Sequence, residues 1–239
     1  MASVTLAQRY QQGCAFLSEQ GLNLIAVFDC TREPVAKMLG SQAVDFSRLL
    51  LIGNGGAGFW RVLQANSNDS KNPVDDFSRQ IAVRMVEEYL HARSLVLYPG
   101  DLNLPLQQLG ALIGWHYPSP LGIGNHPKYG LWFAYRAVVL TDAPLVPTVP
   151  IMGSSACLSC DNQPCLSACP AQALAQLGQP NIERCLSWRT TPDSSCETTC
   201  LARLVCPVGR KHRYDMQQIE YHYGRSLHDL QAEQAIKTQ

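Results

Sequence analysis

Over the first 140 residues, apolar side chains follow a helical spacing in some segments and form continuous runs in others. A helix is predicted near the amino terminus, with an apolar face made by Leu6, Tyr10, Cys14 and Leu17. Continuous apolar runs predict buried strands at 24–28, 48–52, 94–98 and 132–140. A short helix is expected around 105–113. This alternation favours an α+β domain around a central sheet, without fixing the strand order.

A further helix is expected to begin at Asp75 or Asp76, because a carboxylate can accept hydrogen bonds from the free N–H groups of a first helical turn. Its apolar face would carry residues spaced by four, namely Phe77, Ile81, Met85 and Tyr89. The stretch TDAPLVPTVPIMGSS, from Thr141, holds three prolines, which predicts an extended linker. We therefore expect an α+β domain at 1–150 and a smaller domain with a carboxy-terminal helix at 151–239.

Charge and hydropathy exclude some functional classes. Nineteen basic and nineteen acidic residues give a net charge of zero, so there is no strong nucleic-acid signal of the kind that many phosphate contacts require. The sequence contains no run of about 18 apolar residues, so no membrane span is predicted. The amino terminus lacks the basic and apolar regions of a secretory signal, so a cytoplasmic location is expected.

The spacing of the cysteines is the most informative feature of the sequence. Eight of the ten cysteines lie between Cys157 and Cys206, and in a reducing compartment such a group indicates metal binding instead of disulfides. The first four follow Cys157-x2-Cys160-x4-Cys165-x3-Cys169-Pro170, a bacterial ferredoxin run with two residues inserted in its middle gap. The other four are Cys185, Cys196, Cys200 and Cys206, the last also followed by proline.

In the ferredoxin arrangement, the cysteine next to proline binds the other cluster. One [4Fe–4S] cluster would then be held by Cys157, Cys160, Cys165 and Cys206. The second would be held by Cys169, Cys185, Cys196 and Cys200. Zinc is the main alternative, although zinc sites favour repeated C-x2-C pairs and only one such pair is present. A second alternative is that the chain binds one cluster instead of two. Cys14 and Cys30 are interpreted as small core residues.

The segments 114–142, CLSCDNQPCLSACPAQAL (157–174) and ERCLSW (183–188) resemble the epoxyqueuosine reductase family. The resemblance implies a cobalamin-binding, nitroreductase-like domain followed by a ferredoxin-like domain with two [4Fe–4S] clusters. It also places a lone cluster ligand at Cys185. Residues 126–140 further resemble the cblC-type cobalamin-processing proteins. Where the family has Gly-Lys-Asn after its Gly-Trp, this chain has His116-Tyr117-Pro118, so the queuosine substrate is not transferred.

The resemblance implies a corrinoid cavity, for which the candidate residues are Trp115, Pro127, Trp132 and Arg136. The aromatic residues could equally be core residues, and Arg136, in an apolar strand, needs either a buried partner or a ligand. The catalytic candidates are Asp101, His116 and His126. Each histidine could instead be structural.

Two further motifs have a functional and a simple interpretation. The glycine-rich segment 53–58 matches the dinucleotide fingerprint G-x-G-x-x-G, or is only a tight turn. A group of basic residues surrounds the last cluster cysteine: Arg203, Arg210, Lys211, His212 and Arg213. It is either a solvated surface patch, or it compensates the negative charge of a cluster or docks an electron donor.

Taken together, these features predict an iron–sulfur oxidoreductase that is cobalamin-dependent or processes corrinoids. Its partners would be a soluble electron donor of flavodoxin or ferredoxin type and a small-molecule or corrinoid substrate. The alternatives are a non-catalytic ferredoxin-like electron carrier and a reductase that uses a nicotinamide or a flavin.

Overall fold

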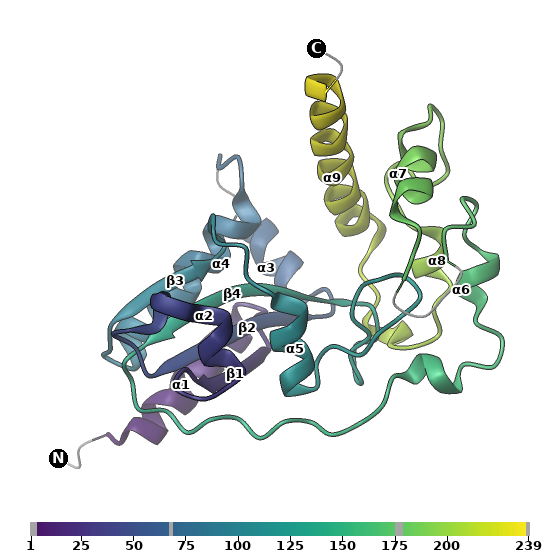
Figure 1. Ribbon diagram of the computed structural model, residues 1–239. Coiled ribbons are helices and arrows are strands. Elements are labelled where there is room, and N and C mark those ends of the chain that lie inside the picture. Colours follow the sequence, from purple (N-terminus) through teal and green to yellow (C-terminus); the bar gives the residue numbers. More distant parts are fainter. Residues whose placement is uncertain (1–3, 67–68, 175–178, 238–239) are drawn as a thin grey trace. The chain divides into compact units, whose positions relative to one another are not determined.

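The computed structural model describes residues 4–66, 69–174 and 179–237 (Figure 1). It divides into two compact units, Met1–Ile113 with Phe133–Ile151, and Gly114–Trp132 with Met152–Gln239. The segment 114–132 therefore groups with the cysteine-rich residues, whereas the boundary at residue 150 assigns it to the first domain.

The first unit is built on an antiparallel sheet. In the described part of the chain, four strands lie in the order β1-β2-β4-β3. Their bounds are β1 (Leu24–Asp29), β2 (Arg48–Gly55), β3 (Ser94–Tyr98) and β4 (Phe133–Thr141). Every neighbouring pair is antiparallel. All four strands predicted from apolar runs are confirmed, and β2 is buried from Leu49 to Gly55 because it lies between β1 and β4.

Helices of the first unit pack on this sheet (Figure 1). They are α1 (Leu6–Glu19), α2 (Val35–Leu39), α3 (Gly58–Ala65), α4 (Pro73–Arg84) and α5 (Leu106–Ile113), with a 3-10 turn at Gly40–Ala43 and a π-helical turn at Met85–Tyr89. Helix α4 packs on β3 and β4, and α1 packs on the π-helical turn. The predicted start of α4 at Asp75 or Asp76 is wrong, because Pro73 opens the helix and both carboxylates lie in its first turn.

The glycine-rich segment is part of the sheet. Gly53, Asn54 and Gly55 continue β2, and only Gly56 has a positive φ, at 79°. Gly53 is required because a Cβ there would lie 2.7 Å from the carbonyl oxygen of Ala134 on the next strand. A dinucleotide fingerprint needs a parallel βαβ unit, which this antiparallel sheet does not provide. The simple interpretation, a tight turn, therefore holds only at Gly56, whereas Gly53 serves a close backbone approach within the sheet.

The predicted linker is confirmed as extended. Residues 142–155 form neither helix nor strand. Thr148 anchors the linker within the first unit, since its N–H donates to the Val27 carbonyl and its Oγ1 accepts from the Val27 N–H, both at 2.9 Å.

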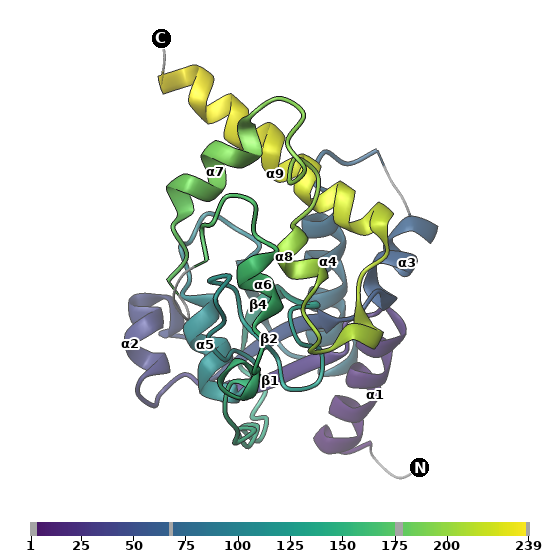
Figure 2. The ribbon, with the colours of Figure 1, turned by 90° about the vertical axis from the view of Figure 1, so that its right-hand side faces the viewer.

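The second unit consists of short helices and turns followed by one long helix. Its helices are α6 (Pro164–Ser167), α7 (Ile182–Thr190), α8 (Leu201–Leu204) and α9 (Met216–Lys237), with 3-10 turns at Ala156–Ser159 and Arg210–His212. Helix α7 contacts α9, and α6 contacts α8 (Figure 2). Helix α9 confirms the expected carboxy-terminal helix. None of the helices in the described ranges is long and apolar enough to cross a membrane.

Candidate metal centre and cofactor residues

The structure brings the cysteines of the first expected ligand set near one another. Burial, followed by the nearby Cys206, Cys157 and Cys160, raises the pKa of the Cys165 thiol. Burial, and then Cys157 and Cys160, also raises the pKa of Cys206. Cys206 comes from the far end of the cysteine region, yet its thiol lies close enough to those of the first motif for their charges to interact. This is the juxtaposition that the crossed ligand arrangement requires.

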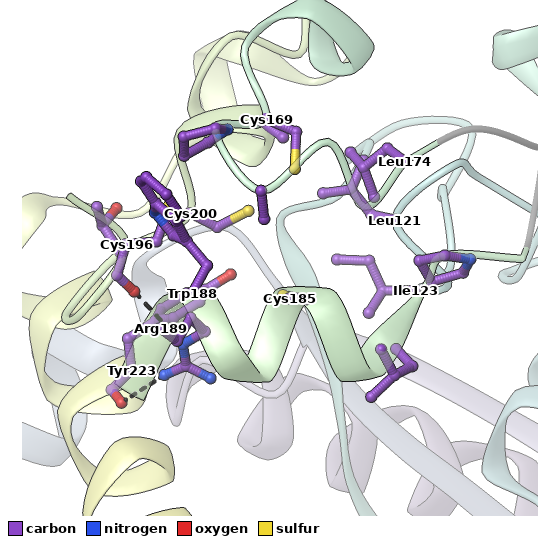
Figure 3. A pocket seen from close by; sticks show the side chains of 16 residues that line it. Leu121, Ile123, Cys169, Leu174, Cys185, Trp188, Arg189, Cys196, Cys200 and Tyr223 are labelled. Atoms are coloured by element: carbon purple, nitrogen blue, oxygen red, sulfur yellow. Dashed lines mark hydrogen bonds between the residues drawn. The ribbon is translucent and has the colours of Figure 1, made fainter. Parts of the chain in front are cut away.

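The second expected set lines a single cavity within the second unit. Cys169, Cys185, Cys196 and Cys200 all contribute to its wall (Figure 3). Burial chiefly raises the pKa of Cys185, and the nearby Cys169 and Cys196 add to this effect. Burial likewise raises the pKa of Cys200, with further increases from Cys196 and Cys185. Cys169 therefore lies with the second set, although its sequence neighbours lie with the first.

The rest of the cavity wall is mostly apolar. It includes Leu121, Ile123, Pro170, Leu174, Pro180 and Trp188. The cavity has a volume of about 140 Å³, well below the roughly 300–1,000 Å³ typical of sites for drug-sized ligands. Its size suits a compact inorganic group and not a corrin ring. Over the described residues, no three His, Cys, Asp or Glu side chains are close enough to hold a single metal ion.

Local hydrogen bonds hold the loops that carry these thiols. Ser155 Oγ donates to the Pro118 carbonyl at 2.7 Å and accepts from the Cys157 N–H at 3.2 Å, which joins the 114–132 segment to the first motif. The side-chain amide of Asn125 donates to Cys157 Sγ at 3.5 Å. The Ala173 N–H donates to Cys169 Sγ at 3.4 Å. Each set thus has at least one sulfur that accepts a hydrogen bond. Sequence reasoning missed Asn125, which has no motif of its own.

The basic group is only partly solvated. The Arg203 guanidinium lies 4.5 Å from the ring centroid of Trp132, and its Nη2 donates to the Leu131 carbonyl at 2.6 Å. The Arg213 guanidinium lies 5.7 Å from the same ring and donates to the Leu204 carbonyl. Arg210 and Lys211 are exposed. Two of these cations are therefore part of the packing of the second unit.

The candidate cofactor residues are divided between the units. Trp115, Pro127 and Trp132 lie in the second unit, and Arg136 lies in the first. Trp132 is fully buried against Tyr214, at a ring-centroid distance of 5.4 Å. Trp115 is also buried, whereas Pro127 is exposed. Both tryptophans are therefore buried, as core residues would be, and their role toward a cofactor stays a prediction.

Arg136 has the buried partner that its position in an apolar strand demands. Its Nε donates to Asn54 Oδ1 at 2.6 Å, and its guanidinium lies 4.7 Å from the ring centroid of Phe59. Asn54 in turn donates from Nδ2 to the Gly56 carbonyl at 3.1 Å. The glycine-rich segment and Arg136 therefore form one polar network in the first unit.

The three catalytic candidates lie in different surroundings. Asp101 is exposed in a turn. Burial lowers the pKa of the half-buried His116. Burial, followed by Lys128 and His212, lowers the pKa of His126 to about 4. His126 Nδ1 accepts from the N–H groups of Lys128 and Tyr129, at 3.0 and 3.3 Å, so this histidine organises its own turn.

Comparison with known proteins gives one relative by sequence. No protein-family model matches the chain. Epoxyqueuosine reductase from Bacillus subtilis (strain 168) is 44% identical over 99 residues, which are 35% of this chain and 24% of that protein. The match spans about a quarter of the length of the curated relative.

Solved structures extend the similarity over most of the chain. Epoxyqueuosine reductase, solved with an epoxyqueuosine-modified tRNA stem loop, matches with a TM-score of 0.60 and 15% identity over 90% of this chain and 69% of that chain. The chain has the fold of epoxyqueuosine reductase. A catabolic reductive dehalogenase in complex with 3-bromo-4-hydroxybenzoic acid matches with a TM-score of 0.52 and 12% identity, over 98% and 40% of the two chains. The resemblance and the predicted α+β, nitroreductase-like fold are confirmed.

Proposed function

We propose that this chain is an iron–sulfur reductase with two [4Fe–4S] clusters and a corrinoid-dependent active site. The observation that supports it best is the division of eight cysteines into two sets of four, in which Cys169 and Cys206 exchange places. Bound clusters would supply single electrons, and a bound corrinoid would supply the reducing centre. The sequence similarity to a known reductase supports an enzyme over a carrier.

The residues present fit two clusters. All eight thiols are free, and three of them are buried while the others are half-buried, so the sites are shielded from water. The N–H groups that reach Cys157 Sγ and Cys169 Sγ would stabilise the anionic sulfurs. The apolar walls of the second cavity would exclude water, which together with such hydrogen bonds sets the potential of a cluster.

The proposal is tested first by metal content. Protein reconstituted anaerobically should contain about eight iron and eight sulfide per chain, as two cubanes require. About four of each would leave one cluster, and stoichiometric zinc in the native protein would contradict the redox function.

Corrinoid binding is tested separately, by titration with cob(II)alamin and cob(III)alamin followed by visible and electron-spin spectra. If the Arg136 guanidinium donates to the corrinoid as well as to Asn54, Arg136→Met should weaken binding about tenfold or more, since a charge-assisted hydrogen bond contributes about 1.5–3 kcal/mol. Arg136→Lys, which keeps the charge, is the matched control. If neither form of cobalamin binds at micromolar protein, flavin is the next ligand to test. If flavin also fails, the electron-carrier alternative gives the better account.

The substrate needs its own experiment. The neighbouring epoxyqueuosine reductase was solved with a tRNA stem loop, which stands against our expectation of a small-molecule or corrinoid substrate without nucleic acid. Binding of a tRNA stem loop to the cluster-loaded protein at two salt concentrations would decide between them, because phosphate contacts weaken steeply with salt. The electron donor and the cytoplasmic location remain parts of this proposal.

A further inference from the structure

Arg189 is a buried cation beside the second set of cysteines. It lies on α7 four residues after Cys185, so both side chains share one helix face. Only 8% of Arg189 is exposed, and it contributes to the wall of the cavity that the four cysteines line. The four-residue spacing of Cys185 and Arg189 can be read from the sequence, but it is not part of the ferredoxin cysteine motif.

The guanidinium is fixed by neutral acceptors (Figure 3). Its Nε donates to the Cys196 carbonyl at 3.4 Å, and its Nη2 donates to the Tyr223 carbonyl at 3.1 Å. Its Nη1 donates to Ser226 Oγ at 3.3 Å, and the group lies 5.1 Å from the ring centroid of Tyr223. These bonds connect α7 to α9 and to a cysteine-bearing loop.

The positive charge itself has no ion-pair partner in the described structure. Among the side chains described, which end at residue 232 on α9, no carboxylate lies within 4.0 Å of the Arg189 guanidinium. A buried charge is costly unless an opposite charge compensates it. The groups nearby that can become anionic are the thiols of the cavity, which are thiolates when they bind metal.

We infer that Arg189 is the built-in counter-ion of the second cluster and raises its reduction potential. This inference rests on the proposed function, because it requires a cluster on Cys169, Cys185, Cys196 and Cys200. Four thiolates make such a cluster a net anion, and reduction adds one more negative charge. A fixed cation in a water-poor site stabilises the reduced form more than the oxidised form, and net charge is among the terms that set these potentials.

The test compares a neutral and a charged replacement in the full-length protein, reconstituted anaerobically. Arg189→Gln keeps N–H donors for the carbonyl groups but removes the charge, whereas Arg189→Lys keeps the charge. A redox titration monitored by electron paramagnetic resonance measures the midpoint potential of each cluster. The signal of the second cluster is the one that Cys169→Ala removes.

Arg189→Gln should lower the equilibrium constant for reduction of the second cluster about tenfold, a shift of about 59 mV for a one-electron couple. Arg189→Lys should stay close to the unmodified protein, and the first cluster should not change in either variant. Loss of the second cluster in Arg189→Gln but not in Arg189→Lys would also support a counter-ion.

Three outcomes would overturn the inference. An unchanged potential in Arg189→Gln would show that the charge has no influence. Equal shifts, or equal loss of the second cluster, in both variants would assign Arg189 a packing role only. Absence of a second cluster from the unmodified protein would overturn the proposed function itself, and iron content distinguishes that failure from the other two.

Discussion

Gly130 and Gly209 meet backbone to backbone, each in a conformation that favours glycine. Their φ angles are 59° and 67°. A Cβ on Gly130 would overlap the carbonyl oxygen of Val208, and a Cβ on Gly209 would overlap that of Tyr129. This contact fastens the 114–132 segment to the residues that follow the last cysteine. Both glycines lie in the second unit.

Gly209→Ala should therefore destabilise the second unit by more than about 2 kcal/mol, since positive φ and steric overlap act together. Thermal unfolding of the cluster-loaded protein under anaerobic conditions measures the effect. Gly224→Ala is the matched control, because Gly224 lies in α9 with open space around it and should gain up to about 1 kcal/mol. Equal melting temperatures for the two variants would contradict the close contact.

Cys169→Ala should remove the second cluster and leave the first, because Cys169 lines the cavity of Cys185, Cys196 and Cys200. Iron content should fall from about eight to about four per chain. Cys165→Ala should instead damage the first cluster, and Cys14→Ala should change neither. If Cys169→Ala removed the signal that Cys165→Ala removes, the crossed assignment would be wrong.

Asn125→Leu should lower the reduction potential of the first cluster and leave the second unchanged. The Asn125 amide donates to Cys157 Sγ, and such a bond stabilises the more anionic reduced form. Leucine has a similar shape and no donor. A redox titration of both clusters measures the change. An equal shift of both potentials would indicate a structural disturbance and not the loss of one hydrogen bond.

His126 should make the folded state less stable in acid. Burial is the main cause that lowers its pKa from 6.5 to about 4. Between pH 4 and pH 6.5 the unfolded chain binds a proton at this histidine that the folded chain does not. The contribution of neutral His126 to the free energy of unfolding is therefore complete above pH 6.5 and is lost as the pH falls toward 4. The full loss, reached below pH 4, would be about 3.5 kcal/mol, since the shift is about 2.5 pKa units and one unit corresponds to about 1.4 kcal/mol.

His126→Asn tests this, because Oδ1 of asparagine can accept the two N–H bonds that Nδ1 accepts from Lys128 and Tyr129. Denaturant unfolding at pH 7 and pH 5 should show a smaller acid loss in the variant. His228→Asn, at an exposed position of α9, should behave like the unmodified protein. Equal acid losses in all three proteins would show that His126 titrates normally.

The sequence predicted what depends on local pattern or on fixed spacing. The four strands followed from apolar runs. The crossed ligand sets, which the two Cys-Pro endings predict, stay a prediction, supported by Cys169 lining the same cavity as Cys185, Cys196 and Cys200. The start of α4 was misplaced because Pro73 already supplies a helical φ before the acidic residues are reached. The grouping of the 114–132 segment with the second unit was not expected, because contacts such as that of Gly130 with Gly209, 79 positions apart, leave no periodicity in the sequence.

The two units alternate along the chain, and this alternation limits which gene segments recombination can exchange. The chain passes from one unit to the other between 113 and 114, 132 and 133, and 151 and 152. A gene fragment starting at codon 152 would encode all eight clustered cysteines, yet it would lack Leu121, Ile123 and Asn125, which line the second cavity or contact Cys157. The cysteine-rich half alone is therefore not a cassette that recombination can transfer. A continuous exchange that preserves the second unit must begin by codon 114, and it then carries β4 and the linker, residues 133–151, along.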